Sequence, residues 1–119
     1  MRSVLLILIA TSVAFGDTIG PDEPLIFRSE TDRVTLSCSY QTNSEHVDLY
    51  WYRHYPKSEP QYLLWKGARA RDGEKHMPDS HFESSTSRTS TELIIKVAAL
   101  TDSALYYCAL WKSTMIQSS

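Results

Sequence analysis

The residues with the greatest capacity for chemistry are two cysteines, Cys38 and Cys108, which lie 70 positions apart in a chain of 119 residues. If they pair, they form one disulfide, because two cysteines allow a single intramolecular connection. If they do not, they remain two free thiols, and the spacing alone leaves this alternative open. A disulfide closing a loop of this length stabilises a fold by about 4 kcal/mol, through the entropy of the unfolded chain.

The N-terminal segment predicts an oxidising compartment, which favours the disulfide. Met1–Ala10 contains a basic residue followed by an apolar run, and Ala14 and Gly16 are small residues at the positions that a signal peptidase reads. We therefore predict a signal peptide over residues 1–16, cleaved after Gly16. Polar residues interrupt the run, so a membrane anchor is the weaker interpretation. Secretion would expose both cysteines to conditions in which disulfides form.

Residue patterns typical of enzymes and metal sites are weak. His76 and His81 flank Asp79, but their spacing fits no face of a helix or strand well, and Pro78 intervenes. No serine lies in a nucleophile elbow and no glycine-rich phosphate loop is present. We expect no enzymatic activity, no metal and no cofactor.

Composition and charge indicate an ordinary globular protein. Hydrophobic residues make up 42% of the chain and charged residues 22%, which argues against extensive disorder. The length suits one domain, which we expect over residues 17–112, with a C-terminal tail over 113–119 outside it. The net charge of −2 and the lack of a basic run argue against a nucleic-acid partner.

Alternating apolar residues predict an all-β chain. Val34, Leu36 and Cys38 alternate with polar residues, and Leu93, Ile95 and Val97 lie on one face of a later predicted strand. Other predicted strands cover residues 49–54, 61–66, 81–88 and 104–108, and a helical turn is predicted over 98–102. A first edge strand is predicted over 17–28, and the prolines at positions 21 and 24 divide it in two.

The strand ending at Cys108 is apolar on both faces. Tyr106 and Cys108 lie on one face, and Leu105 and Tyr107 on the other, because side chains alternate along a strand. A sheet with one face in water would not need this pattern. We therefore expect one face to pack on a second sheet and the other to meet a partner outside the domain.

The set Cys38, Trp51, Tyr106 and Cys108 resembles the signature of the immunoglobulin fold. The resemblance implies a V-type Greek-key β-sandwich in which Cys38 and Cys108 join the two sheets, Trp51 packs against the bridge, and Tyr106 anchors a corner. The core anchors it implies are Trp51, Leu93, Leu100 and Tyr106.

Two runs make the resemblance more specific. Trp51–Pro56 (WYRHYP) and Asp102–Leu110 (DSALYYCAL) resemble T-cell receptor variable segments of the alpha/delta type, over about residues 17–110. A gamma-chain segment stays open. The resemblance implies recognition of antigen, a peptide on a histocompatibility molecule, after joining to J and constant segments. The constant region would bring receptor signalling subunits and the membrane anchor at the plasma membrane. The alternative is a V-set adhesion or inhibitory receptor.

The resemblance also implies two surfaces. Residues of the outward face that would meet the partner chain's variable domain are Tyr52, His54, Pro60, Leu64 and Tyr107. The antigen loops would be 41–47, 67–75 and the residues from 109 onward, with candidate contacts at His46, Asp48, Arg69, Arg71, Leu110 and Trp111. Each candidate contact can equally be a solvated loop residue.

The chain departs from the family pattern in three places. His54 replaces a glutamine that pairs across the receptor dimer, and His81 replaces an arginine that pairs with the residue here numbered Asp102. A histidine would make this ion pair weaker, and Arg53 is our candidate for a substitute partner of Asp102. Nothing after Cys108 resembles the last, J-encoded strand with its Phe-Gly-x-Gly bulge, so we expect an unpaired edge there. Residues 113–119 would then be translated from beyond the coding end of a germline segment.

Overall fold

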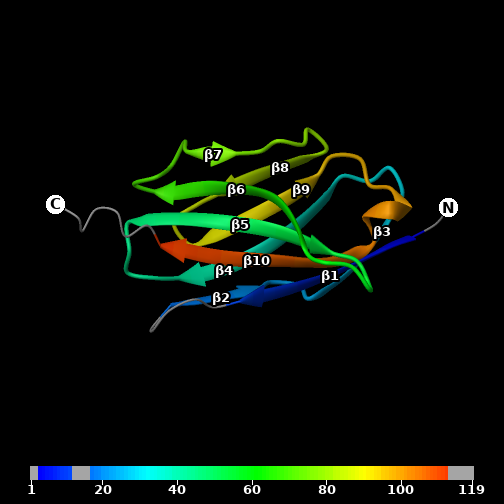
Figure 1. Ribbon diagram of the computed structural model, residues 1–119, viewed down its shortest axis with the longest axis horizontal. Coiled ribbons are helices and arrows are strands. Elements are labelled where there is room, and N and C mark those ends of the chain that lie inside the picture. Colours follow the sequence, from blue (N-terminus) through cyan, green and yellow to red (C-terminus); the bar gives the residue numbers. More distant parts are fainter. Residues whose placement is uncertain (1–2, 12–16, 113–119) are drawn as a thin grey trace.

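The computed structural model, which describes residues 3–11 and 17–112, is a sandwich of two β-sheets (Figure 1). The front sheet has six strands in the order β3-β1-β10-β5-β6-β7, and the back sheet has four in the order β2-β4-β9-β8. This arrangement confirms the predicted all-β V-type sandwich. Among the described residues, no helix is long and apolar enough to cross a membrane.

The strands have the following bounds. The front sheet contains β1 (Ser3–Thr11), β3 (Leu25–Ser29), β5 (His46–His54), β6 (Gln61–Arg69), β7 (Lys75–His76) and β10 (Ala104–Lys112). The back sheet contains β2 (Thr18–Pro21), β4 (Val34–Gln41), β8 (Phe82–Thr86) and β9 (Ser90–Ile95). A 3₁₀ turn, η1 (Leu100–Asp102), precedes β10.

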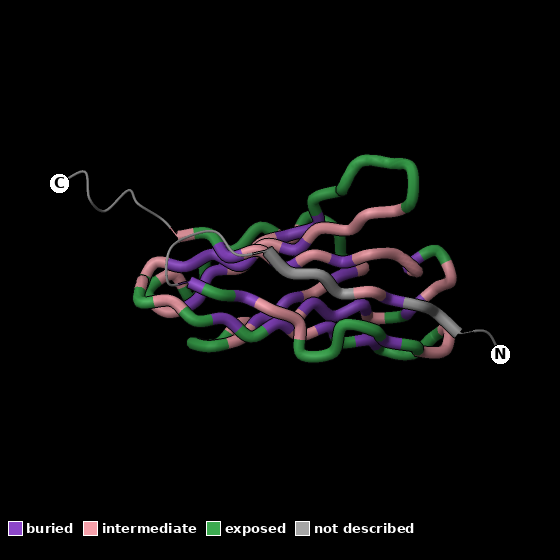
Figure 2. The backbone as a smooth tube through the Cα atoms, turned by 90° about the horizontal axis from the view of Figure 1, so that it is seen from below, coloured by how far each residue is buried: buried purple, intermediate pink, exposed green. Residues whose placement is uncertain are grey.

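The alternating pattern of the back sheet produces the core. Leu36 of β4 and Leu93 of β9 are fully buried and lie opposite each other, and buried positions line the interior between the sheets (Figure 2). Leu100 is partly buried and packs against the same core. The prediction that Val97 shares a strand face with Leu93 and Ile95 was wrong, because β9 ends at Ile95. Val97 is 56% exposed as a result.

The two prolines near the start divide the first predicted strand, as expected. β2 ends at Pro21 and pairs with β4 in the back sheet, whereas β3 begins after Pro24 and pairs with β1 in the front sheet. Proline cannot donate to a strand ladder, so the chain changes sheets at this point.

The disulfide between Cys38 and Cys108 joins the back sheet to the front sheet. Trp51, the neighbour of Cys108 in the β5–β10 register, is fully buried. Its indole Nε1 donates a hydrogen bond to Oγ1 of Thr91 at 3.1 Å, which satisfies its polar atom inside the core. The predicted bridge and the burial of Trp51 are therefore confirmed.

A buried carboxylate organises the turn before β10. The Tyr106 hydroxyl donates to the carbonyl of Asp102 at 2.7 Å, and burial raises the pKa of Tyr106, so the hydroxyl keeps its proton. The Asp102 carboxylate accepts from the Ala99 amide at 2.9 Å and lies 3.0 Å from Nε2 of His81. Nη1 of Arg53 lies 3.7 Å from the same carboxylate, so the proposed substitute partner is present, but it acts beside His81 and does not replace it.

The N-terminal segment lies within the front sheet. β1 runs parallel to β10 and antiparallel to β3, and Leu6 of β1 is fully buried in the core. The expected unpaired edge of β10 was wrong for the full chain, because this apolar run forms main-chain pairs along it. The signal peptide over residues 1–16 stays a prediction. Its cleavage site at Gly16 and the tail over 113–119 lie outside the described residues.

Replacing Asp102 with alanine removes the acceptor for the Ala99 amide and leaves His81 and Arg53 without their shared partner. We expect the free energy of unfolding, measured by urea denaturation, to fall by about 3 kcal/mol, as for other broken buried ion pairs. The control is Asp72→Ala at an exposed position, which we expect to cost less than about 0.5 kcal/mol. Equal losses for the two variants would contradict this role of Asp102.

The position of β1 can be tested by cross-linking the refolded full chain. Ile7 lies opposite Leu105, so the double variant Ile7→Cys/Leu105→Cys should form a second disulfide within one molecule, detected by peptide mass spectrometry. The control pair Ile7→Cys/Ala109→Cys should not link, because Ala109 lies opposite Thr11, about 13 Å further along the strand. Linkage in the control, or none in the test pair, would contradict the register.

Candidate functional site

The outer face of the front sheet carries a cluster of aromatic side chains. Alternation along β5 directs Tyr50 and Tyr52 away from the core, opposite to Trp51, and β6 adds Tyr62 and Trp65. Tyr50 stacks on Tyr52 and on Trp65 with ring centroids 6.3 Å and 6.1 Å apart. Burial raises the pKa of Tyr50 and of Tyr62, so these phenols stay neutral. We call Tyr50, Tyr52, Tyr62, Trp65 and Tyr107 the aromatic face.

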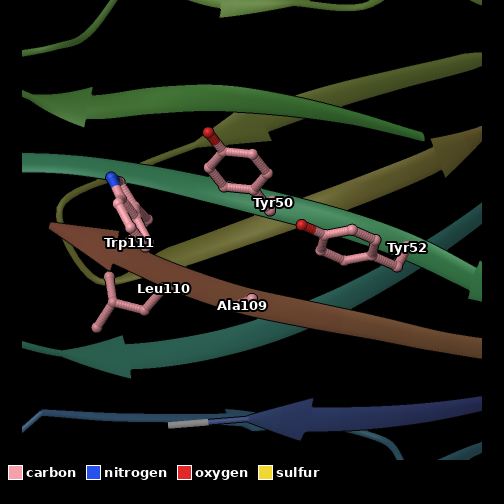
Figure 3. A pocket seen from close by; sticks show the side chains of 5 residues that line it. All are labelled: Tyr50, Tyr52, Ala109, Leu110 and Trp111. Atoms are coloured by element: carbon pink, nitrogen blue, oxygen red, sulfur yellow. The ribbon is translucent and has the colours of Figure 1, made fainter. Parts of the chain in front are cut away.

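Two adjacent hollows lie on this face. One, of 280 Å³, is lined by Tyr50, Tyr52, Ala109, Leu110 and Trp111 (Figure 3). The other, of 250 Å³, is lined by Tyr52, Pro60, Tyr107 and Ala109. Tyr52 and Ala109 contribute to both hollows, which therefore form one shallow apolar surface. The structure thus brings together three of the five residues predicted for the partner interface, namely Tyr52, Pro60 and Tyr107.

His54 is held by its own chain at the margin of this surface. Its Nε2 lies 2.7 Å from the carbonyl of Ser58, and its ring lies 6.3 Å from the Tyr107 ring. A carbonyl only accepts, so Nε2 carries the proton and donates. Nδ1 is buried without a hydrogen-bond partner. His54 therefore does not present a free amide-like group outward, as a glutamine would.

Leu64 was wrongly predicted to lie on the outer face. It is fully buried, because the β5–β6 register shifts between Trp51 and Tyr52, and Trp51 lies opposite Leu64 while Tyr52 lies opposite Tyr62. Leu63 is the extra residue at this irregularity, and it is also buried. Tyr62, which is 38% exposed, takes the outward position. Tyr62 could not be predicted as the outward residue, since an uninterrupted apolar run does not reveal where a bulge lies.

The loops expected to contact antigen lie at one end of the sandwich. The β5–β6 and β5–β10 registers place His46 opposite Arg69 and Val47 opposite Lys112, so the start of β5 and the ends of β6 and β10 adjoin. The connections themselves, 42–45 and 70–74, are shorter than predicted, because β5 and β6 extend into them. We call these two connections and the end of β10 the loop end.

Asp48 and Arg71, two of the candidate contacts, pair with each other. Nε of Arg71 donates to Oδ1 of Asp48 at 2.7 Å, and this hydrogen bond raises the pKa of Arg71. The Asp48 side chain is only 7% exposed, and the Arg71 guanidinium lies 5.5 Å from the Trp65 ring centroid. Gly67 allows the backbone of Arg71 to lie close to β6, since a Cβ at position 67 would lie 2.2 Å from the Arg71 carbonyl oxygen. The pair leaves little unbalanced charge for a ligand.

The last two candidate contacts on β10 differ in exposure. Leu110 was wrongly expected in a loop, because β10 continues to Lys112 and places Leu110 opposite Leu49, fully buried in the core. Trp111, the next residue, points outward and is 58% exposed (Figure 3). His46 is half-buried at the start of β5.

The histidines considered for a metal site are engaged separately. His76 bonds to the Tyr62 hydroxyl through Nδ1 at 2.7 Å, and His81 pairs with Asp102. Within residues 3–11 and 17–112, no group of three histidine, cysteine or acidic side chains could hold a metal ion.

Comparisons with known proteins agree with this geometry. The family model for the immunoglobulin V-set domain matches residues 23–119. The chain is 30% identical to human T cell receptor alpha variable 14/delta variable 4 over 116 residues, covering 91% of this chain and 96% of that one. It is 34% identical to the mouse T-cell receptor alpha chain V region CTL-F3 over 108 residues, covering 91% and 80%. Human T cell receptor beta variable 13 is 31% identical over 108 residues, covering 91% and 84%. The chain therefore belongs to the immunoglobulin V-set family, as a T-cell receptor variable segment of the alpha/delta type.

Proposed function

We propose that this domain recognises a peptide on a histocompatibility molecule, as the variable domain of a T-cell receptor alpha or delta chain at the extracellular face of the plasma membrane. It does so after joining to J and constant segments, without catalysis. The constant region, in turn, connects it to the receptor signalling subunits.

One observation carries this proposal: the aromatic face and the loop end occur together on the front sheet. Aromatic side chains in a shallow apolar hollow are typical of the centre of a protein–protein interface. The adjoining loops can vary in sequence without disturbing the core, because they extend from a rigid sandwich. A second variable domain bound to the aromatic face would leave the loop end free for antigen.

Tyr107 is the best position at which to test pairing through the aromatic face, because it lines the 250 Å³ hollow and its strand is fixed by the disulfide. The chain, joined to J and alpha constant segments, is co-expressed with a panel of second receptor chains in cells that lack their own receptor. We expect Tyr107→Asp to reduce surface receptor, measured by flow cytometry, by at least about tenfold, since a charge would be buried at the interface.

The matched control is Thr35→Asp, which adds the same charge at an exposed position of the back sheet. We expect it to assemble like the parent chain, and circular dichroism of both purified variants checks their folding. Unchanged assembly of Tyr107→Asp would contradict the pairing face. Transcripts that continue into a stalk and membrane helix, instead of a receptor constant exon, would favour the adhesion or inhibitory receptor and contradict the proposal as a whole.

A further inference from the structure

Arg69, predicted from the sequence as an antigen contact, donates to three carbonyl groups of its own chain. Nη1 donates to the carbonyls of Thr42 and Ser44, both at 2.7 Å. Nε and Nη2 donate to the carbonyl of Arg88 at 3.0 Å and 2.5 Å. The guanidinium also lies 5.3 Å from the Tyr40 ring centroid. One side chain thus contacts the connection 42–45 and the turn between β8 and β9.

The backbone of Arg69 gives a second, independent observation. Its φ is 58°, in the left-handed region that glycine and asparagine adopt more easily than arginine. The planar group of donors of Arg69, which can reach several acceptors at once, offsets the less favourable backbone.

Other contacts connect the same segments. The Ala70 amide donates to the carbonyl of Glu45 at 2.9 Å, and Glu45 pairs with Arg88 at 2.7 Å. The connection 42–45, the connection that begins at Ala70 and the β8–β9 turn therefore meet around one guanidinium. The Glu45–Arg88 pair is exposed on both sides, so we assign most of the constraint to the half-buried Arg69.

We propose that Arg69 is a positioning residue that fixes the first antigen loop relative to the second, and that it acts through Thr42 and Ser44 without contacting antigen itself. This inference rests on the proposed function for the role of the loops. The structural effect that it describes can be measured on the chain alone.

The test is hydrogen exchange of the full chain, followed by mass spectrometry, with Arg69→Asn as the main variant. Asparagine suits the left-handed backbone but removes the donors to Thr42, Ser44 and Arg88. We expect amide exchange in residues 42–45 and 87–89 to rise by about tenfold or more, since hydrogen bonds from charged groups are lost. Exchange in β4 and β9 should stay unchanged. Arg69→Lys should give a smaller rise than Arg69→Asn, because the ammonium group still donates to some of the three carbonyls. It should not restore the parental exchange, because one ammonium group cannot reach all three.

The matched control is Arg33→Asn, which removes an arginine paired with Glu83 at 3.3 Å on the exposed surface. It should leave the exchange of residues 42–45 unchanged. Parental exchange of the loops in Arg69→Asn would overturn the proposal, and so would an equal rise throughout the core, which would indicate a general effect on stability. Since no second chain or antigen is present, failure of the proposed function would not alter this result.

Discussion

The disulfide between Cys38 and Cys108 is the constraint on which the rest of the structure depends. It joins the centre of β4 in one sheet to β10 in the other, and it fixes the face of each strand that points inward. Trp51 fills the adjacent space from β5 and donates its indole hydrogen to Thr91 in the back sheet. One covalent bond and one large side chain thus hold the sheets in register, and the buried aliphatic residues pack around them.

The positions of the aromatic face and of the loop end both follow from this constraint. Once Cys108 faces inward, alternation along β10 directs Tyr107 and Trp111 outward, beside Tyr50 and Tyr52 of β5. The aromatic face is therefore the reverse side of the strands that form the core. The ends of the same strands carry the loop end, and the charged residues there mostly bind their own chain. Arg69 and Arg71 bind groups of their own chain, whereas Trp111 is exposed. This difference suggests that the arginines hold the loops in place and that exposed groups such as Trp111 are available to a ligand.

The sequence predicted the features that depend on local alternation and spacing. The strands around Cys38 and Cys108, the division at the prolines and the burial of Trp51 all follow from patterns within a few residues. It failed where a strand is irregular or longer than its pattern. A bulge turned Leu64 inward, the extension of β10 buried Leu110, and the early end of β9 exposed Val97. Ion pairs and hydrogen bonds between distant segments, such as those of Arg69, have no local signature, so the sequence does not reveal which charged residues near the loops bind their own chain.

The most direct test of the account is the contribution of the disulfide to stability. The free energy of unfolding would be measured by urea denaturation for the oxidised full chain and for the double variant Cys38→Ala/Cys108→Ala. The account predicts a loss of about 4 kcal/mol, a large share of the total for a domain of this size. Equal free energies of unfolding for the two proteins would contradict the claim that this bond holds the sandwich together.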